Sequence, residues 1–166
     1  GGTLLTTHGR TTGRIAKTGT DPWGRFCWSQ YRGRRDEGVV IICAYRVCQS
    51  QSSQTAGPYT AFQQQYTLMR NAGYVAPDPR QQLLTDLSAL IESQRSEGYR
   101  PMLLMDANGD YNASTNQDKA LARFLVDNNL VDPFHDKFKT SPRTYAYGTR
   151  RIDYIFTDPM CVSAIQ

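Results

Sequence analysis

Carboxylate and amide side chains follow a short apolar run in residues 100–112, RPMLLMDANGDYN. Asp106 and Asn108 stand directly after this run as a D-x-N pair, and Gly109–Asn112 forms an overlapping candidate, GDYN. Polar groups at the end of a buried strand face a crevice rather than the core. We therefore expect Asp106 and Asn108 to be available for chemistry, and the GDYN residues to lie in the outgoing loop, where turn formation explains them.

The same stretch alternates Asp106, Asn108 and Asp110 in the manner of a calcium-binding loop. An EF-hand loop starting at Asp106 requires Gly at its sixth position and Glu at its twelfth, where this chain has Tyr111 and Gln117. The residues before Asp106 also favour a strand rather than a helix. These mismatches exclude the calcium-loop interpretation.

A second candidate carboxylate, Asp153, lies in the apolar run RRIDYIFTDP of residues 150–159. A carboxylate in such a strand is costly to bury unless it is paired or used in chemistry. Arg151 lies two residues earlier, on the same face of a strand, and could simply pair with it. Both roles for Asp153 therefore stay open.

A third strand-like run ends in Tyr45 and Arg46, which are donors suited to a phosphate group. The alternative for Tyr45 is a buried phenol bonded to a backbone carbonyl. Hydrolysis of a phosphodiester needs an orienting group for water, donors for phosphoryl oxygens and usually a divalent cation. Asp, Asn, Tyr and Arg side chains at strand ends supply the first two of these requirements.

The hydrophobic pattern predicts the elements that position these residues. We expect an antiparallel meander, a surface loop over 49–57, three helices and two later strands. Residues 101–105 form a continuous apolar run, as in a strand buried on both faces. The result is a mixed sheet covered by helices, an α/β or α+β layered architecture. The predicted strands are 2–7, 25–31, 38–44, 101–105 and one within 150–159, and the predicted helices are 59–71, 79–97 and 117–129.

The length of 166 residues, with 39% hydrophobic and 20% charged residues, predicts one folded domain. The net charge of +4 arises in the first 50 residues, where cations exceed acids. This excess favours a polyanionic partner such as nucleic acid, or else a solvated basic face. The four cysteines lack a C-x-x-C pair, so we expect reduced structural thiols. No signal peptide or membrane span is evident, and we expect an intracellular rather than a secreted protein.

The order of these motifs resembles the C-terminal portion of the endonuclease/exonuclease/phosphatase family, the deoxyribonuclease-I-like proteins. The strand ending in Ala44-Tyr45, the strand ending in D-x-N and the closing TYAYGTRRIDYIF carry the resemblance, which runs from about Gly1 to Cys161. It implies a sandwich of mixed β-sheets flanked by helices, and magnesium- or manganese-dependent cleavage of phosphate esters. The excess of basic residues in the first 50 positions favours nucleic acid as the substrate.

The resemblance also implies residue roles. Asp106 matches the aspartate that activates water, and Asn108 its partner that steadies the phosphate or a second metal. Asp153 matches the aspartate that orients a catalytic histidine or assists the metal, and Tyr45 a tyrosine that contacts the scissile phosphate. Arg46 and Arg151 are further substrate-binding candidates.

The chain departs from the family pattern at several positions. Met105 replaces the usual glycine before Asp106, and Arg46 and Cys48 stand where Pro and Asn often follow the tyrosine. The family's metal-binding glutamate and its closing Asp-His lie outside the matched segment. We therefore expect residues 1–166 to be a partial domain, incomplete at both ends and inactive alone, with the primary metal ligand outside this chain.

Three hypotheses follow from the sequence. The leading one is a metal-dependent nuclease. It could be linked to a reverse transcriptase domain, as in mobile elements, or be a cellular repair enzyme or a stand-alone nuclease. The second is a nucleic-acid-binding module that has lost catalysis. The third is a phosphodiesterase of the same fold that acts on lipid or inositol phosphates.

Overall fold

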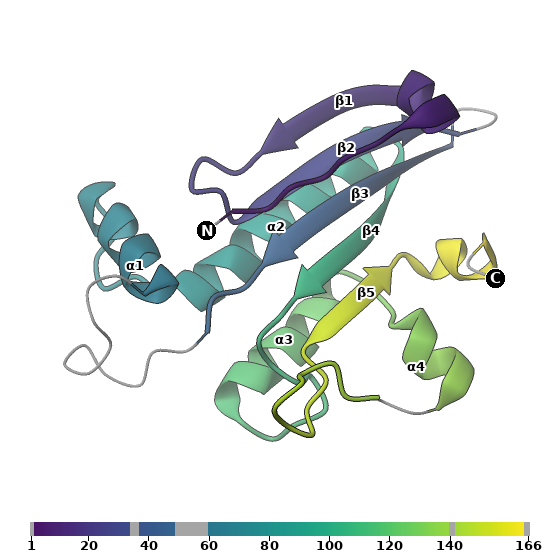
Figure 1. Cartoon of the computed structure of the whole chain (residues 1–166). Helices are drawn as coiled ribbons and strands as arrows, with labels where there is room; N and C mark the ends of the chain where they lie inside the picture. Colours follow the sequence, from purple (N-terminus) through teal and green to yellow (C-terminus); the bar gives the residue numbers. More distant parts are fainter. Residues whose placement is uncertain (1, 34–36, 49–59, 140–141, 165–166) are drawn as a thin grey trace.

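The computed structural model describes residues 2–33, 37–48, 60–139 and 142–164. After an antiparallel start of three strands, pairs of helices precede each of the last two strands (Figure 1). The strands are β1 (Ile15–Thr20), β2 (Phe26–Arg32), β3 (Gly38–Tyr45), β4 (Tyr99–Asp106) and β5 (Asp153–Thr157). The α-helices are α1 (Ala61–Asn71), α2 (Pro79–Ser96), α3 (Asn116–Asp127) and α4 (Pro133–Phe138), and the 3₁₀ helices are η1 (Gly9–Arg14) and η2 (Pro159–Ala164).

The five strands form one mixed sheet in the order β1-β2-β3-β4-β5. β1, β2 and β3 pair antiparallel as a meander, β4 pairs parallel to β3, and β5 pairs antiparallel to β4. The long helix α2 makes the crossover that a parallel β3–β4 pair requires. The predicted mixed sheet with flanking helices is confirmed.

Helix α2 covers one face of the sheet and forms the core with it (Figure 1). Its N-cap Asp78 accepts hydrogen bonds from Arg80 N and Gln81 N, and Pro79 occupies the first turn. The apolar side chains of α2 recur every three or four residues, and they are fully buried against alternate residues of β3 and β4. These buried residues are Leu83, Leu84, Leu87, Ile91, Val40, Ile42, Ala44, Leu103 and Met105.

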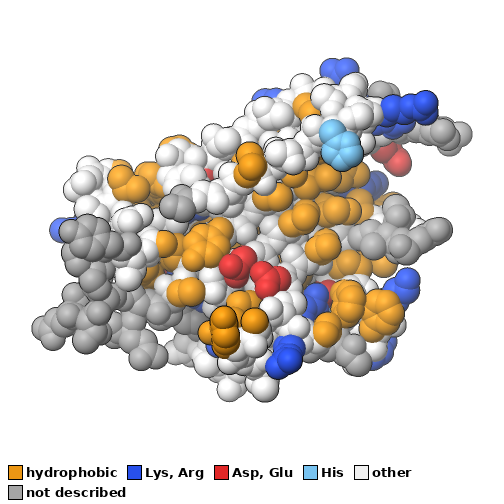
Figure 2. Space-filling view, viewed as in Figure 1, with side chains coloured by type: hydrophobic (Ala, Val, Ile, Leu, Met, Phe, Trp, Pro, Cys, Tyr) orange, Lys and Arg blue, Asp and Glu red, His pale blue; other side chains and the backbone are white. Residues whose placement is uncertain are grey.

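The opposite side of the sheet, which we call the open face, is less buried. Alternate residues of β3, β4 and β5 point to it: Val39, Ile41, Cys43, Tyr45, Met102, Leu104, Asp106, Asp153 and Ile155. Ile155 is 46% exposed. Figure 2 shows this face, with hydrophobic side chains spread over the strands. The prediction that strand 101–105 is buried on both faces is therefore wrong, because Met102 and Leu104 are only half-buried.

Other boundaries also differ from the sequence prediction. Residues 2–7 form no strand, and the first strand is Ile15–Thr20, after the 3₁₀ helix η1. Helix α4 was not predicted, although Asp132-Pro133 starts it as Asp78-Pro79 starts α2. The expected loop 49–57 lies outside the described residues. Cys27, Cys43, Cys48 and Cys161 are free thiols. No helix in the described part of the chain is both long and apolar enough to span a bilayer.

Candidate active site

Tyr45, Asp106 and Asp153 form a row across three neighbouring strands. Tyr45 is the parallel partner of Asp106, and Asp106 is the antiparallel partner of Asp153. Because paired residues of a sheet point to the same side, all three side chains project from the open face. Figure 2 shows acidic side chains together among hydrophobic ones on this face. The structure thus brings together three residues that are far apart in sequence.

Asp106 and Asp153 are close neighbours. The amide of Ala107 donates to Ile152 O at 2.8 Å, so the next pair along the ladder, Asp106 and Asp153, is a non-hydrogen-bonded pair. The Cβ atoms of such pairs are roughly 4.5–5.5 Å apart. Burial raises the pKa of Asp106, and the charge of Asp153 raises it further, while the amide of Asn108 and the charge of Arg80 oppose the shift. Two carboxylates therefore share one small region of the sheet.

Asn108 follows this row in a left-handed conformation, with φ of 43°. Its backbone N–H donates to Asp106 Oδ1 at 3.1 Å, and its side-chain Nδ2 donates to Arg46 O at 2.8 Å. The thiol of Cys48 donates to Asn108 Oδ1 at 3.1 Å. These bonds fix the amide plane beside Asp106, so the D-x-N pair acts as one rigid unit.

Tyr45 is half-buried beside the same unit. Its phenol is hydrogen-bonded to the side chains of Asn108 and Cys48. Burial raises the pKa of Tyr45, and the neighbouring Cys48 and Asp106 raise it further. The phenol therefore remains protonated at neutral pH. It is a hydrogen-bond donor next to the carboxylate of Asp106.

Thr144 is a site residue that our sequence reasoning missed. Its hydroxyl oxygen accepts hydrogen bonds from Ile152 N at 2.9 Å and from Asp153 N at 3.0 Å. These bonds hold the start of β5, and with it the Asp153 carboxylate, in place. In the sequence, the only indication of this role is that Thr144 begins the TYAY segment, nine residues before Asp153.

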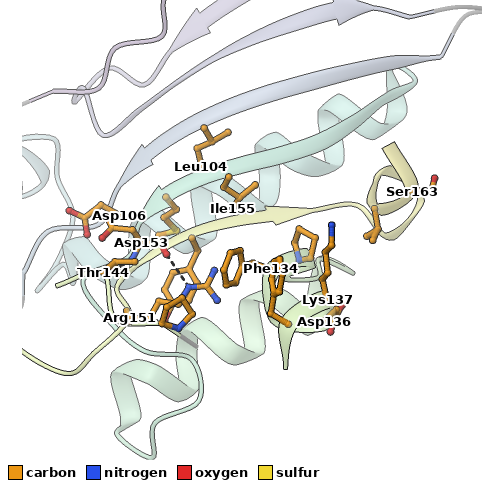
Figure 3. Close-up of a pocket in the computed structure, with 16 residues that line it drawn as sticks. Leu104, Asp106, Phe134, Asp136, Lys137, Thr144, Arg151, Asp153, Ile155 and Ser163 are labelled. Atoms are coloured by element: carbon orange, nitrogen blue, oxygen red, sulfur yellow. Dashed lines mark hydrogen bonds between the residues drawn. The ribbon is translucent and has the colours of Figure 1, made fainter. Parts of the chain in front are cut away.

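Arg151 is buried and bonded within the protein. Its guanidinium forms an ion pair with Asp132, with Nη2 3.2 Å from Oδ1, and Nε donates to Asp153 O at 3.3 Å (Figure 3). Asp132 also caps α4 and accepts a hydrogen bond from Tyr111 OH at 3.1 Å. The suggestion that Arg151 pairs with the Asp153 carboxylate is wrong. Arg151 instead anchors the entry to β5 on the buried Asp132.

Arg46 is only 1% exposed. Its side chain lies beneath the loop after β4 rather than on the open face, since a methyl group on Gly109 would come within 3.3 Å of its Nη1. Direct contact of Arg46 with a substrate is therefore not available in this conformation. The structure separates Arg46 from the row of Tyr45, Asp106 and Asp153. Arg151, although its guanidinium is held by Asp132, lines the groove that Asp106 and Asp153 also line.

A groove with a volume of about 1130 Å³ runs from the two aspartates along β5 (Figure 3). The open face of β4 and β5 forms its floor, and α4 and η2 flank it. Phe134 and Phe138 of α4 are 41% and 51% exposed along this groove. The site is thus the polar end of an apolar groove.

Arg25 and Arg32, two of the described basic residues in the first 50 positions, do not lie at this site. Arg25 is buried with Asp21 and Asp86. Arg32 pairs with Gly38, which pairs with Tyr99 at the start of β4, so Arg32 lies about 23 Å along the strands from Asp106. Arg34 and Arg35 lie outside the described residues. The charge excess of this segment is therefore not a measure of the charge near the site.

Solved structures share this fold at low sequence identity. One is a 3′ phosphatase, NExo from Neisseria, bound to a product DNA hairpin. It matches with a TM-score of 0.55 and 15% sequence identity, and the match covers 86% of this chain and 55% of that chain. Another is the 3′–5′ exonuclease NExo from Neisseria meningitidis: TM-score 0.54, 16% identity, covering 87% of this chain and 56% of that chain. The chain thus spans little more than half the length of these structures.

The sequence itself matches no family model and no curated protein. The likeness is therefore one of fold: the chain has the α/β fold of the endonuclease/exonuclease/phosphatase proteins, with a mixed five-stranded sheet and flanking helices.

Proposed function

We propose that residues 1–166 are part of a metal-dependent phosphodiester hydrolase that acts on nucleic acid. One observation carries the proposal: Asp106 and Asp153, which the family resemblance singled out, are direct cross-strand partners on the open face. Like charges placed directly opposite one another destabilise a sheet. A role in chemistry explains why they stand opposite one another, in a row with Tyr45.

The chain's own residues have distinct roles in this proposal. Asp106 accepts a proton from, or orients, the attacking water, because its carboxylate is held by the Asn108 amide beside the open face. Asn108 and Tyr45 donate hydrogen bonds to phosphoryl oxygens. Thr144 positions Asp153 through two backbone amides. Tyr45, Asp106 and Asp153 project from the same side of the sheet.

Mg²⁺ or Mn²⁺ is the cofactor that we propose. Carboxylate oxygens are the ligands that Mg²⁺ prefers, and it is commonly held by one or two carboxylates with the substrate phosphate. Asp106 and Asp153 fit that pattern and would hold the ion, which would neutralise charge on the phosphoryl group. No three His, Cys, Asp or Glu side chains come together among the residues described. As the family resemblance implies, we expect the primary metal ligand to come from outside this chain.

Nucleic acid is the substrate class that we favour. Tyr145 and Tyr147 lie in the loop that leads to β5, are 44% and 91% exposed, and contact each other edge to face with centroids 6.1 Å apart. Exposed aromatic rings are surfaces on which bases stack. Their position a few residues from Thr144 and Asp153 suits a polymer that extends beyond the scissile phosphate.

The test is cleavage by the full-length protein. Labelled duplex and single-stranded oligonucleotides are incubated with Mg²⁺, with Mn²⁺ and with EDTA, alongside an inositol phosphate and a phospholipid. We expect metal-dependent cleavage of an oligonucleotide. Release of phosphate or headgroup from the small esters alone, or binding of oligonucleotide without any cleavage, would contradict the proposal.

A further inference from the structure

Two arginines are buried directly behind the proposed site. Arg46 follows β3 and Arg80 lies in the first turn of α2, and each is 1% exposed. Fully buried arginines are uncommon, because moving a charge out of water costs free energy. Their presence together at this point of the fold therefore needs an explanation.

Both guanidinium groups lie beneath the loop that carries Asn108. Arg80 donates to Val47 O and, from Nη2, to Asn108 O at 3.1 Å, so it ties the segment after β3 to the segment after β4. Arg46 Nη1 would be 3.3 Å from a methyl group on Gly109. The two charges thus lie on the buried side of the Asn108–Gly109 backbone, and the half-buried side chain of Asn108 lies beside Asp106.

The buried charge beneath this loop is mainly positive. The neighbouring buried carboxylate is Asp118, which is also bonded to Arg150 at 3.2 Å and to Asp110 N at 2.9 Å. Asp78, the other acid near both arginines, is exposed, where water screens its charge. Burial and the charge of Arg80 lower the pKa of Arg46 to about 10, so Arg46 stays protonated at neutral pH. Burial also lowers the pKa of Arg80, and an arginine side chain is not deprotonated in proteins.

We propose that Arg46 and Arg80 are positioning residues whose buried charges favour an anionic phosphate over Asn108. Neither touches the substrate. Arg80 acts through the carbonyls of Val47 and Asn108 that it holds, and both arginines act through a field that water screens poorly. The inference rests on the proposed function and deepens it, because it assigns the binding of the phosphate charge to two residues behind the site. It also explains how a site with two carboxylates can bind an anionic phosphodiester, because the buried positive charges offset their repulsion.

The test compares two ligands in the full-length protein. One is an oligonucleotide that the protein cleaves. The other is the same oligonucleotide with a neutral methylphosphonate at the mapped cleavage position. Binding of each is measured in EDTA for wild type, Arg80→Gln, Arg80→Lys, Arg46→Gln and the exposed control Arg123→Gln, with the fold of each variant checked by thermal unfolding.

We expect Arg80→Gln and Arg46→Gln each to weaken binding of the phosphodiester by about tenfold, and binding of the methylphosphonate by less than about twofold. Arg80→Lys should retain most of the phosphodiester affinity, and Arg123→Gln all of it. Should both ligands weaken equally, or neither, the electrostatic role is wrong. Both Gln variants are made because, if one of them does not fold, the other still tests the electrostatic role.

The two proposals fail differently. If wild type neither binds nor cleaves oligonucleotides, the proposed function is wrong. If wild type cleaves and the Gln variants do not distinguish the two ligands, only the role of Arg46 and Arg80 is wrong.

Discussion

Asp106 and Asp153 lie directly opposite one another on antiparallel strands, as a non-hydrogen-bonded pair on the open face of the sheet. This is the position at which cross-strand side chains approach most closely, and two like charges there oppose folding. Burial and Asp153 both raise the pKa of Asp106, in agreement with that cost. If these carboxylates serve chemistry at the expense of stability, replacing them and the residues around them should have distinct effects on stability and on cleavage.

Replacing Asp106 should stabilise the metal-free protein at neutral pH. A pKa raised above its ordinary value of 3.8 means that the folded state binds the proton more tightly than the unfolded chain. The free energy of unfolding therefore falls as pH rises through that window, and the cost persists at pH 7. We expect Asp106→Asn to raise the unfolding temperature at pH 7 in EDTA, with a difference that shrinks as pH falls toward 3.8.

The control for that measurement is Asp127→Asn on α3, whose side chain is 65% exposed. An exposed carboxylate contributes little to stability, so the unfolding temperature should barely change at either pH. A loss of stability in Asp106→Asn at pH 7 would show that the Asp106 charge is favourable in the fold.

Thr144 should affect the rate of cleavage because it positions Asp153. Thr144→Val keeps the shape but removes the oxygen that accepts from Ile152 N and Asp153 N, whereas Thr144→Ser keeps it. A displaced catalytic group commonly costs up to about a hundredfold in rate. We expect kcat to fall roughly tenfold to a hundredfold in Thr144→Val, with KM little changed, and to stay near wild type in Thr144→Ser. Equal rates in the two variants would remove Thr144 from the site.

The Arg151–Asp132 pair should matter for stability. Both side chains are buried, and removing one partner leaves an unpaired buried charge, at a cost of about 3–5 kcal/mol. Arg151→Met should therefore shift the urea midpoint strongly. The matched change Arg123→Met breaks an exposed pair with Asp127 at 4.0 Å and should cost less than about 0.5 kcal/mol. Similar small losses in both variants would mean that Arg151 does not anchor β5.

Local patterns in the sequence predicted the elements that carry the site. The apolar run before Asp106 predicts a strand end, and the spacing of Leu83, Leu84, Leu87 and Ile91 predicts α2. The pairing of Asp106 with Asp153 was not predicted, because register depends on contacts between segments 47 residues apart in sequence. The partner of Arg151 was missed for the same reason, since Asp132 lies 19 residues earlier.

Other expectations failed for physical reasons. Residues 2–7 were predicted to form a strand from their leucines and their β-branched threonines, but β2 pairs with Ile15–Thr20 instead. A strand needs a partner, which residue propensity alone does not specify. Arg46 was expected to face the substrate because it follows Tyr45, but alternation along the chain turns it to the other side, where it is buried.

The central claim is that Asp106 and Asp153 form a catalytic pair, and cleavage rates of their variants test it most directly. Single-turnover cleavage of a labelled oligonucleotide by the full-length protein is measured with saturating Mg²⁺ for wild type, Asp106→Asn, Asp153→Ala and the exposed control Asp127→Asn. We expect the first two variants to remain folded and to lose at least about a hundredfold in rate, and the control to match wild type. Near-wild-type cleavage by either Asp106→Asn or Asp153→Ala would contradict the assignment.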